Sequence, residues 1–129
     1  MANELVLVVE DNEKNRKLAR DVLQFHGYQI VETDNAEEGI RLARERKPAL
    51  ILLDFHLPGM NGIEALAQLR ADPATKSIPV IAVTASAMTE DRRKIMEAGF
   101  EALQTKPIQV KEFVKVVGDT IARARATAA

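Results

Sequence analysis

Two periodicities of apolar residues alternate along the chain. Short continuous apolar runs are typical of strands covered on both faces, and the stretches between them carry apolar residues at helical spacing. The predicted strands are residues 5–9, 28–31, 49–53, 78–83 and 101–105. The predicted helices are residues 13–25, 61–70, 86–98 and 110–125, with a further helix that begins after Asn35 and continues through Ala43. This βα order, repeated five times, predicts an α/β fold: a doubly wound, five-stranded parallel sheet with helices on both faces and right-handed crossovers.

Glycine, proline and capping residues mark the helix boundaries. Gly27 and Gly99 are predicted to end the first and fourth helices. Asn35 is the expected N-cap of the second helix, and Glu38 three positions later predicts a capping box. Pro48 ends the connection to the third strand.

Apolar stripes predict which helix faces contact the sheet. The predicted core positions of the first and last helices are Leu18, Val22, Phe25, Phe113, Val117 and Ile121. The methionines are interpreted as core or gap-filling residues: Met60, Met88 and Met96. Residues 126–129 are expected to fray. Arg16, Lys17 and Arg20 are interpreted as a solvated helix face.

The composition of the chain mainly excludes certain classes of function. A chain of 129 residues without repeats or an internal linker is expected to be one domain, residues 1–129. Its 18 basic and 19 acidic residues give a net charge of -1, which argues against binding to nucleic acid or to an anionic membrane. The absence of cysteine removes thiol nucleophiles and thiolate metal sites. With neither a secretory signal nor an apolar membrane span, a cytoplasmic protein is expected.

Polar residues stand where four of the predicted strands end. Glu10 and Asp11 follow the first strand, Asp54 the third and Thr84 the fourth, while Lys106 closes the fifth. Ligands of open parallel sheets bind beyond the carboxyl ends of the strands. Three carboxylates repel one another there, and a hard divalent cation such as Mg²⁺ relieves the repulsion.

A phosphoryl group is the substrate that this set suits. Its transfer places charge on equatorial oxygens, which calls for a cation and fixed donors on the side away from the metal. Lys106 supplies a compact positive charge, and the Thr84 hydroxyl and the Ala85 backbone N–H can donate hydrogen bonds.

Each of these residues also has a purely structural interpretation. Glu10 and Asp11 can stabilise a helix N-terminus, Asp54 can be a turn residue, Thr84 can be an N-cap, and Lys106 can be a solvated loop residue. Their coincidence at one sheet edge favours the metal and phosphoryl interpretation.

Four sequence segments carry a resemblance to a known family. They are Val8-Val9-Glu10-Asp11, Leu52-Leu53-Asp54 with Pro58-Gly59-Met60-Asn61-Gly62, Val83-Thr84-Ala85, and Lys106-Pro107. In their order and separations, the chain resembles response-regulator receiver domains of the CheY-like superfamily. It is most similar to the single-domain subgroup that includes the chemotaxis regulator and DivK. The resemblance implies a flavodoxin-like fold and a stand-alone regulator without an output domain.

The resemblance also implies roles for individual residues. Asp54 accepts a phosphoryl group, and Asp11, Asp54 and the backbone carbonyl of His56 contact Mg²⁺, or alternatively Mn²⁺. Glu10 acts on the metal mainly through water. Thr84, the Ala85 N–H and Lys106 contact the phosphoryl oxygens.

Four further positions are implied to modulate the switch. The side chains of His56 and Ser86 tune the access of water to the acyl phosphate. The Lys106–Pro107 bond is expected to be cis and to direct the lysine toward the acidic residues. Leu103 occupies a position where many receivers have Tyr or Phe. We therefore expect phosphorylation to produce a smaller or differently placed structural change at the surface that partners read.

A phosphoryl-accepting switch implies protein partners on both sides. The expected donor is a phosphohistidine on a histidine kinase or a histidine phosphotransfer protein, and the expected reader is a downstream protein target. The protein is expected to be a monomer or a phosphorylation-dependent dimer. It is expected to act as a phosphoryl acceptor and not as a turnover enzyme.

Four other functions compete with this interpretation. A receiver-fold binding module that works without phosphorylation is the main one, and the intact set of five residues argues against it. A phosphatase with an aspartyl nucleophile places a second Asp two residues later, where this chain has His56. A catalytic or zinc-binding role for His56 lacks a nearby second histidine, because the other one is His26. A nucleotide-hydrolysing function would require a G-x-x-x-x-G-K-[ST] phosphate loop, which the sequence lacks.

Overall fold

Strands and helices alternate throughout the protein, as the apolar periodicity predicts. In a computed structural model, which describes residues 3–85 and 89–128, five strands alternate with five helices. The strands are β1 (Leu5–Val9), β2 (Gln29–Thr33), β3 (Leu50–Asp54), β4 (Val80–Thr84) and β5 (Ala102–Thr105). The helices are α1 (Glu13–Phe25), α2 (Ala36–Arg46), α3 (Gly62–Ala71), α4 (Thr89–Ala98) and α5 (Val110–Ala128).

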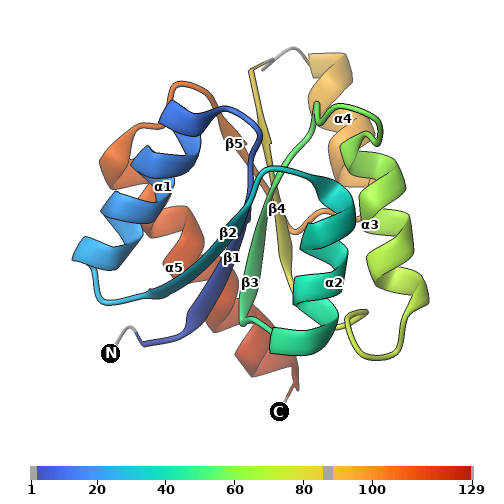
Figure 1. Cartoon of the computed structure of the whole chain (residues 1–129), viewed down its shortest axis with the longest axis horizontal. Helices are drawn as coiled ribbons and strands as arrows, with labels where there is room; N and C mark the ends of the chain where they lie inside the picture. The colour runs from blue at the N-terminus through green and yellow to red at the C-terminus, as the bar shows by residue number, and fades with distance from the viewer. Residues whose placement is uncertain (1–2, 86–88, 129) are drawn as a thin grey trace.

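The strands form one parallel sheet in the order β2-β1-β3-β4-β5. Helices α1 and α5 cover one face, and α2, α3 and α4 cover the other (Figure 1). This arrangement confirms the predicted doubly wound α/β fold. The strand order reverses between β1 and β3, and in such sheets the crevice for ligands opens at the carboxyl ends of these two strands.

Two apolar cores, one on each face, hold the helices against the sheet. Alternate residues of β1 and β3 enter different cores: Leu7 and Ile51 contact the side of α2 and α3, and Val8 and Leu52 contact the side of α1 and α5. All residues of β3 and β4 are buried, as expected for central parallel strands. The predicted stripe of α5, which consists of Phe113, Val117 and Ile121, is buried in the core on the α1 and α5 side.

The predicted core face of α1 is wrong at two of its three positions, Leu18 and Phe25. Ala19 and Leu23 are the buried positions of this helix, Val22 is only partly buried, and Leu18 is exposed. Phe25 is 86% exposed at the end of the helix. Side-chain size misled the assignment, because the small Ala19 faces the core one position away from the larger Leu18.

Several boundaries also differ from the prediction. Strand β2 runs two residues further than expected, to Thr33, and α5 continues to Ala128, so residues 126–128 are helical. The Asn35 side chain accepts a hydrogen bond from the Glu38 N–H at 2.8 Å, but the Glu38 carboxylate lies 3.5 Å from an Arg41 nitrogen. A complete capping box instead opens α3, between Asn61 and Glu64.

The methionines do not share one environment. Met60 is partly buried against the core, whereas Met96 is exposed on α4 and its assignment as a core residue is wrong. Met88 and the first predicted turn of the fourth helix, residues 86–88, lie outside the described residues.

Candidate functional site

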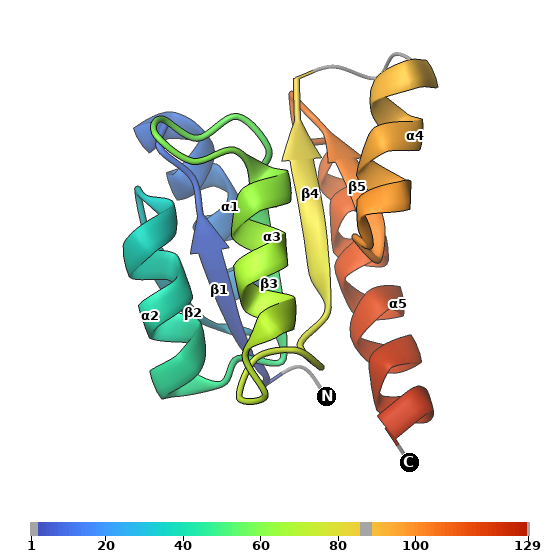
Figure 2. The ribbon, with the colours of Figure 1, turned by 90° about the vertical axis from the view of Figure 1, so that its right-hand side faces the viewer.

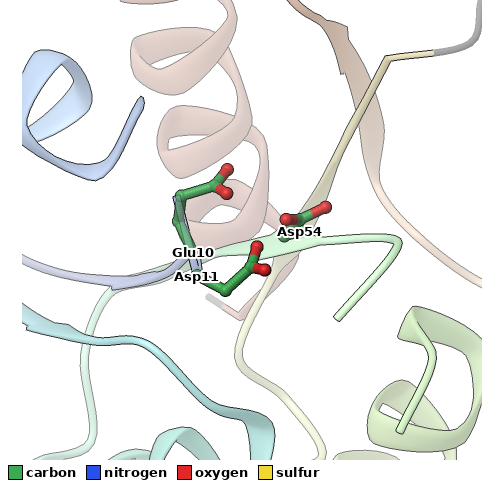
Figure 3. Close-up of side chains that lie close together, drawn as sticks. All are labelled: Glu10, Asp11 and Asp54. Atoms are coloured by element: carbon green, nitrogen blue, oxygen red, sulfur yellow. The ribbon is translucent and has the colours of Figure 1, made fainter. Parts of the chain in front are cut away.

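Three carboxylates meet at the carboxyl ends of two adjacent strands. Glu10 and Asp11 directly follow β1, Asp54 is the last residue of β3, and the register pairs Val9 with Leu53 one position earlier. One carboxylate oxygen from each residue lies within 4.8 Å of the other two. Figure 3 shows the three carboxylates directed toward a shared space. Glu10 and Asp54 are only 5% and 3% exposed, whereas Asp11 is exposed, so the group opens to solvent on one side.

Lys106 reaches these carboxylates from the end of β5. Its Nζ lies 3.0 Å from Glu10 Oε1 and 3.3 Å from Asp54 Oδ2, and its backbone N–H donates to the Thr84 carbonyl at 2.8 Å. The side chain is half-buried between two buried carboxylates, which excludes the interpretation as a solvated loop residue.

Thr84 ends β4, between the strands that carry Asp54 and Lys106. The sheet register pairs Asp54 with Val83 and Thr84 with Thr105, so the buried Thr84 lies one position beyond Asp54 along the sheet edge. Helix α4 begins at Thr89, so Thr84 is not its N-cap. Ala85 follows and is exposed.

Burial and close charges set the protonation of the site. Burial raises the pKa of Glu10 to about 7, and the hydrogen bond that its carboxyl group shares with Asp54 acts in the same direction. For Asp54, burial acts to raise the pKa, but hydrogen bonds from Glu10 and the His56 N–H, together with the charge of Lys106, hold the pKa below its usual value. The two carboxylates raise the pKa of Lys106 despite its burial. Without a metal, the site therefore holds an ionised Asp54, a charged Lys106 and a Glu10 that titrates near neutrality.

The turn between β1 and α1 is fixed by contacts that sequence reasoning missed. Arg16 donates from Nη1 to the Glu10 backbone carbonyl at 2.9 Å and from Nε to Glu32 at 3.1 Å. Arg20 also donates to Glu32, at 3.1 Å. The interpretation of Arg16 and Arg20 as a solvated face is therefore wrong. Glu32 is 16 residues from Arg16 and lies on the neighbouring strand, so no local spacing signalled the contact.

Two of the predicted modulating residues, His56 and Pro107, are exposed and lie within two residues of Asp54 or Lys106 in the sequence. The His56 side chain is exposed and meets the Phe55 ring edge to face, while its backbone N–H donates to Asp54 Oδ1 at 3.0 Å. The Lys106–Pro107 peptide bond is cis, as expected, and Pro107 is exposed. Ser86 lies outside the described residues.

Leu103 is partly buried and packs against the core on the α2, α3 and α4 side of the sheet. Phe100 is buried in the same core, and its ring meets the Phe55 ring at a centroid distance of 6.2 Å. Aromatic contact therefore links the residue after Asp54 to the segment that precedes β5, although the Leu103 position itself has no ring.

The donor set fits a hard divalent cation. Within the described part of the chain, Glu10, Asp11 and Asp54 are the group of acidic, histidine or cysteine side chains close enough to share a metal ion. All three offer oxygen, which Mg²⁺ and Mn²⁺ prefer, and the exposed side leaves room for retained water.

Comparison with known proteins identifies the class. A family model described as the response regulator receiver domain matches residues 6–118, and the chain belongs to this family. The polar-differentiation response regulator DivK of Brucella anthropi is 46% identical over 112 residues, which cover 87% of this chain and 91% of that protein. The DivK of Brucella ovis is 45% identical over the same coverage.

Solved structures agree with this assignment. The receiver domain of the sensor histidine kinase PA1611 from Pseudomonas aeruginosa has a TM-score of 0.86 at 29% identity, covering 94% of this chain and 99% of that one. That structure has a magnesium ion coordinated in its active site cleft. The chemotaxis response regulator CheY4 of Vibrio cholerae shares the fold, with a TM-score of 0.86 at 22% identity over 92% of this chain and 99% of that one. None of the helices described here has the length and apolar character needed to cross a membrane.

Proposed function

We propose that this receiver domain is a phosphoryl-accepting switch in which Asp54 is the acceptor. The observation that carries the proposal is the environment of its carboxylate, which lies 3.3 Å from Lys106 Nζ and accepts the His56 N–H at 3.0 Å. Both contacts favour the ionised, nucleophilic form. A nucleophile that is held charged in a buried site is suited to attack an electrophilic phosphorus.

The groups that this protein contributes to the transfer step all belong to this sheet edge. An oxygen of Asp54 forms a bond to phosphorus while the phosphorus–nitrogen bond of the donor phosphohistidine breaks, and the electron pair of that bond returns to the imidazole. Lys106 and the hydroxyl of Thr84, with the N–H of Ala85, then contact the oxygens of the transferred group. The donor is a histidine kinase or a histidine phosphotransfer protein.

Glu10, Asp11, Asp54 and the backbone carbonyl of His56 would hold Mg²⁺, with Mn²⁺ as an alternative. When bound, the cation neutralises charge that develops on the phosphoryl oxygens. The oxygen-only donor set and the magnesium ion of the PA1611 receiver domain support this choice.

The phosphorylated protein acts in the cytoplasm by contacting a downstream protein target. Phosphorylation adds about -1.5 to -2 charge at Asp54, which draws Thr84 and the following loop toward the new oxygens. Hydrolysis of the acyl phosphate resets the switch, so the protein is not a turnover enzyme.

Intact mass after incubation with acetyl phosphate and MgCl₂ tests this function. We expect one phosphoryl adduct, which disappears when EDTA replaces the metal and in an Asp54→Ala variant. Asp34→Ala, a change at an exposed aspartate outside the site, should leave the adduct unchanged. If the wild-type protein binds Mg²⁺ but gains no mass from acetyl phosphate or from a phosphohistidine donor, the phosphorylation-independent binding module is favoured instead.

A further inference from the structure

The turn that carries two of the three carboxylates is held by hydrogen bonds on both sides of Glu10. The Glu10 N–H donates to the Thr33 carbonyl at 3.1 Å, and the Glu10 carbonyl accepts from Arg16 Nη1 at 2.9 Å. The Asn12 N–H donates to Glu10 Oε2 at 3.1 Å, and the Asn12 side chain caps α1 by accepting the Asn15 N–H at 3.0 Å. These four contacts fix the shape of the turn from Glu10 to Asn12.

Two of the anchors come from β2, although the acidic side chains follow β1 and end β3. Strand β2 is the edge strand beside β1, and its register places Thr33 opposite Val9, the last residue of β1. Figure 2 shows β1 pointing to the upper edge of the sheet, where α1 begins. Thr33 holds the turn directly, whereas Glu32 holds it through Arg16 of α1.

Arg16 connects β2 to the acidic turn through one planar group. Its Nη1 donates to the Glu10 carbonyl, and its Nε donates to Glu32 Oε1 at 3.1 Å. Glu32 is held in turn by Arg20, whose Nη1 lies 3.2 and 3.1 Å from the two carboxylate oxygens. The side chains of Arg16 and Glu32 are 20% and 28% exposed, so water competes weakly for these bonds. Because the guanidinium group is rigid, the contact with Glu32 fixes the direction of Nη1.

The shape of an oxygen ligand set decides between divalent cations of different size. Mg²⁺ requires near-ideal octahedral geometry with oxygen atoms at about 2.0–2.1 Å, whereas Ca²⁺ accepts oxygen atoms at about 2.3–2.6 Å in flexible arrangements. Selectivity between the two therefore depends on the size and flexibility of the ligand set, because both cations carry the same charge. A turn that is free to move accommodates Ca²⁺ more easily than Mg²⁺.

We propose that Arg16 and Glu32 are positioning residues that set the preference of the acidic site for Mg²⁺ over Ca²⁺. The acidic group consists of Glu10, Asp11 and Asp54, so Arg16 and Glu32 act through the Glu10 peptide group. The inference rests on the proposed function for the choice of Mg²⁺ as the cation of the site. Geometry carries the effect, because the charge of Arg16 is paired with Glu32 and any remaining charge acts on both cations alike.

Calorimetric titrations of the metal-free protein with MgCl₂ and with CaCl₂ measure the two affinities and their ratio. Arg16→Gln should weaken Mg²⁺ binding and lower the ratio of Mg²⁺ to Ca²⁺ affinity roughly threefold to tenfold, the range for loss of one hydrogen bond. A purely electrostatic role predicts tighter binding of both cations, because a positive charge is lost, and no change in their ratio. An unchanged ratio in Arg16→Gln would overturn the proposal.

Arg16→Lys keeps the charge but replaces the planar group by a single ammonium group. An ammonium group cannot hold Glu32 and the Glu10 carbonyl in the same fixed geometry, so this variant should also lower the ratio. A ratio equal to that of the wild type would overturn positioning by the guanidinium group.

A double-mutant cycle tests whether Glu32 acts through Arg16. Glu32→Gln should lower the ratio by itself but cause no further decrease in the Arg16→Gln background. An equal decrease in both backgrounds would overturn the proposed connection. Glu45→Gln removes an exposed glutamate that pairs with Arg41 on α2, and it should leave both affinities unchanged.

Two controls keep the interpretation separate from folding and from phosphorylation. Melting temperatures in EDTA show that each variant is folded at the temperature of the titrations. The titrations use no phosphoryl donor, so a wild-type protein that binds Mg²⁺ but gains no phosphoryl group would contradict the proposed function and leave this test intact.

Discussion

Replacement of Lys106 by methionine should have opposite effects on fold stability and on metal affinity. The ammonium group lies 3.0 Å from Glu10 and 3.3 Å from Asp54. At an effective dielectric constant of about 20, each fully charged pair at such a distance contributes about 5 kcal/mol of attraction, before desolvation is subtracted. Removing one partner of a buried pair costs about 3–5 kcal/mol. Because the pKa of Glu10 is about 7, this carboxyl group is partly protonated at neutral pH and the attraction is reduced. We therefore expect Lys106→Met to lower the free energy of unfolding by about 2 kcal/mol in EDTA.

A divalent cation should remove most of this loss. The ammonium group and the metal neutralise the same carboxylates, so Lys106→Met should tighten Mg²⁺ binding by about tenfold, equivalent to about 1.4 kcal/mol. In saturating Mg²⁺, the variant should then be less stable than the wild type by only about 0.6 kcal/mol.

Urea unfolding in EDTA and in saturating MgCl₂ measures both terms. Circular dichroism is the suitable probe, because the chain has no tryptophan. Isothermal titration calorimetry gives the Mg²⁺ affinity directly. Lys111→Met removes an exposed lysine outside the site and should change neither quantity. The same loss of stability with and without Mg²⁺, or a weaker Mg²⁺ affinity in the Lys106 variant, would refute this electrostatic reasoning.

Three further predictions concern the turn after β1, the Glu10 carboxyl group and the helix glycines. Arg16→Gln should weaken Mg²⁺ binding severalfold in a calorimetric titration, because the hydrogen bond to the backbone carbonyl of Glu10 is lost; unchanged affinity would show that this bond does not position the acidic turn. The raised pKa of Glu10 predicts that protons compete with Mg²⁺ below about pH 7, so the Mg²⁺ affinity should rise as the pH increases to about 7 and then level off. Glu10→Gln should abolish this pH dependence. A wild-type Mg²⁺ affinity that does not change with pH would contradict the prediction. Gly39→Ala should lower the free energy of unfolding by about 1–3 kcal/mol, because the added Cβ would lie 2.7 Å from a methyl group of Val9. Gly118→Ala meets only an ordinary contact at 3.8 Å and should raise the free energy of unfolding by up to about 1 kcal/mol. Denaturant unfolding of both variants separates the effect of crowding from that of helix propensity.

The fold and the centre of the site were accessible to sequence reasoning because their signals are local. Strands buried on both faces produce continuous apolar runs such as residues 50–53. Their regular alternation with helices requires a parallel sheet. Once the strands are parallel, the residues that follow them must share one edge, which is why Glu10, Asp54 and Lys106 could be grouped although they are far apart in sequence.

Contacts between distant elements left no comparable signal. The hydrogen bonds of Arg16 depend on how α1 lies over β2, which the helical period does not specify. The burial of Ala19 instead of Leu18 reflects the rotation of α1 against the sheet, and a hydrophobicity pattern assigns the face to the larger side chain.

Chemical identification of the modified residue is the most direct test of Asp54 as the phosphoryl acceptor. Sodium borohydride reduces an aspartyl phosphate to homoserine and leaves free carboxylates intact, so peptide mass spectrometry can locate the modified position. After treatment with acetyl phosphate and MgCl₂, we expect homoserine at position 54 and none when EDTA replaces the metal. Homoserine at Asp11 or at another acidic residue, with Asp54 unchanged, would contradict the account.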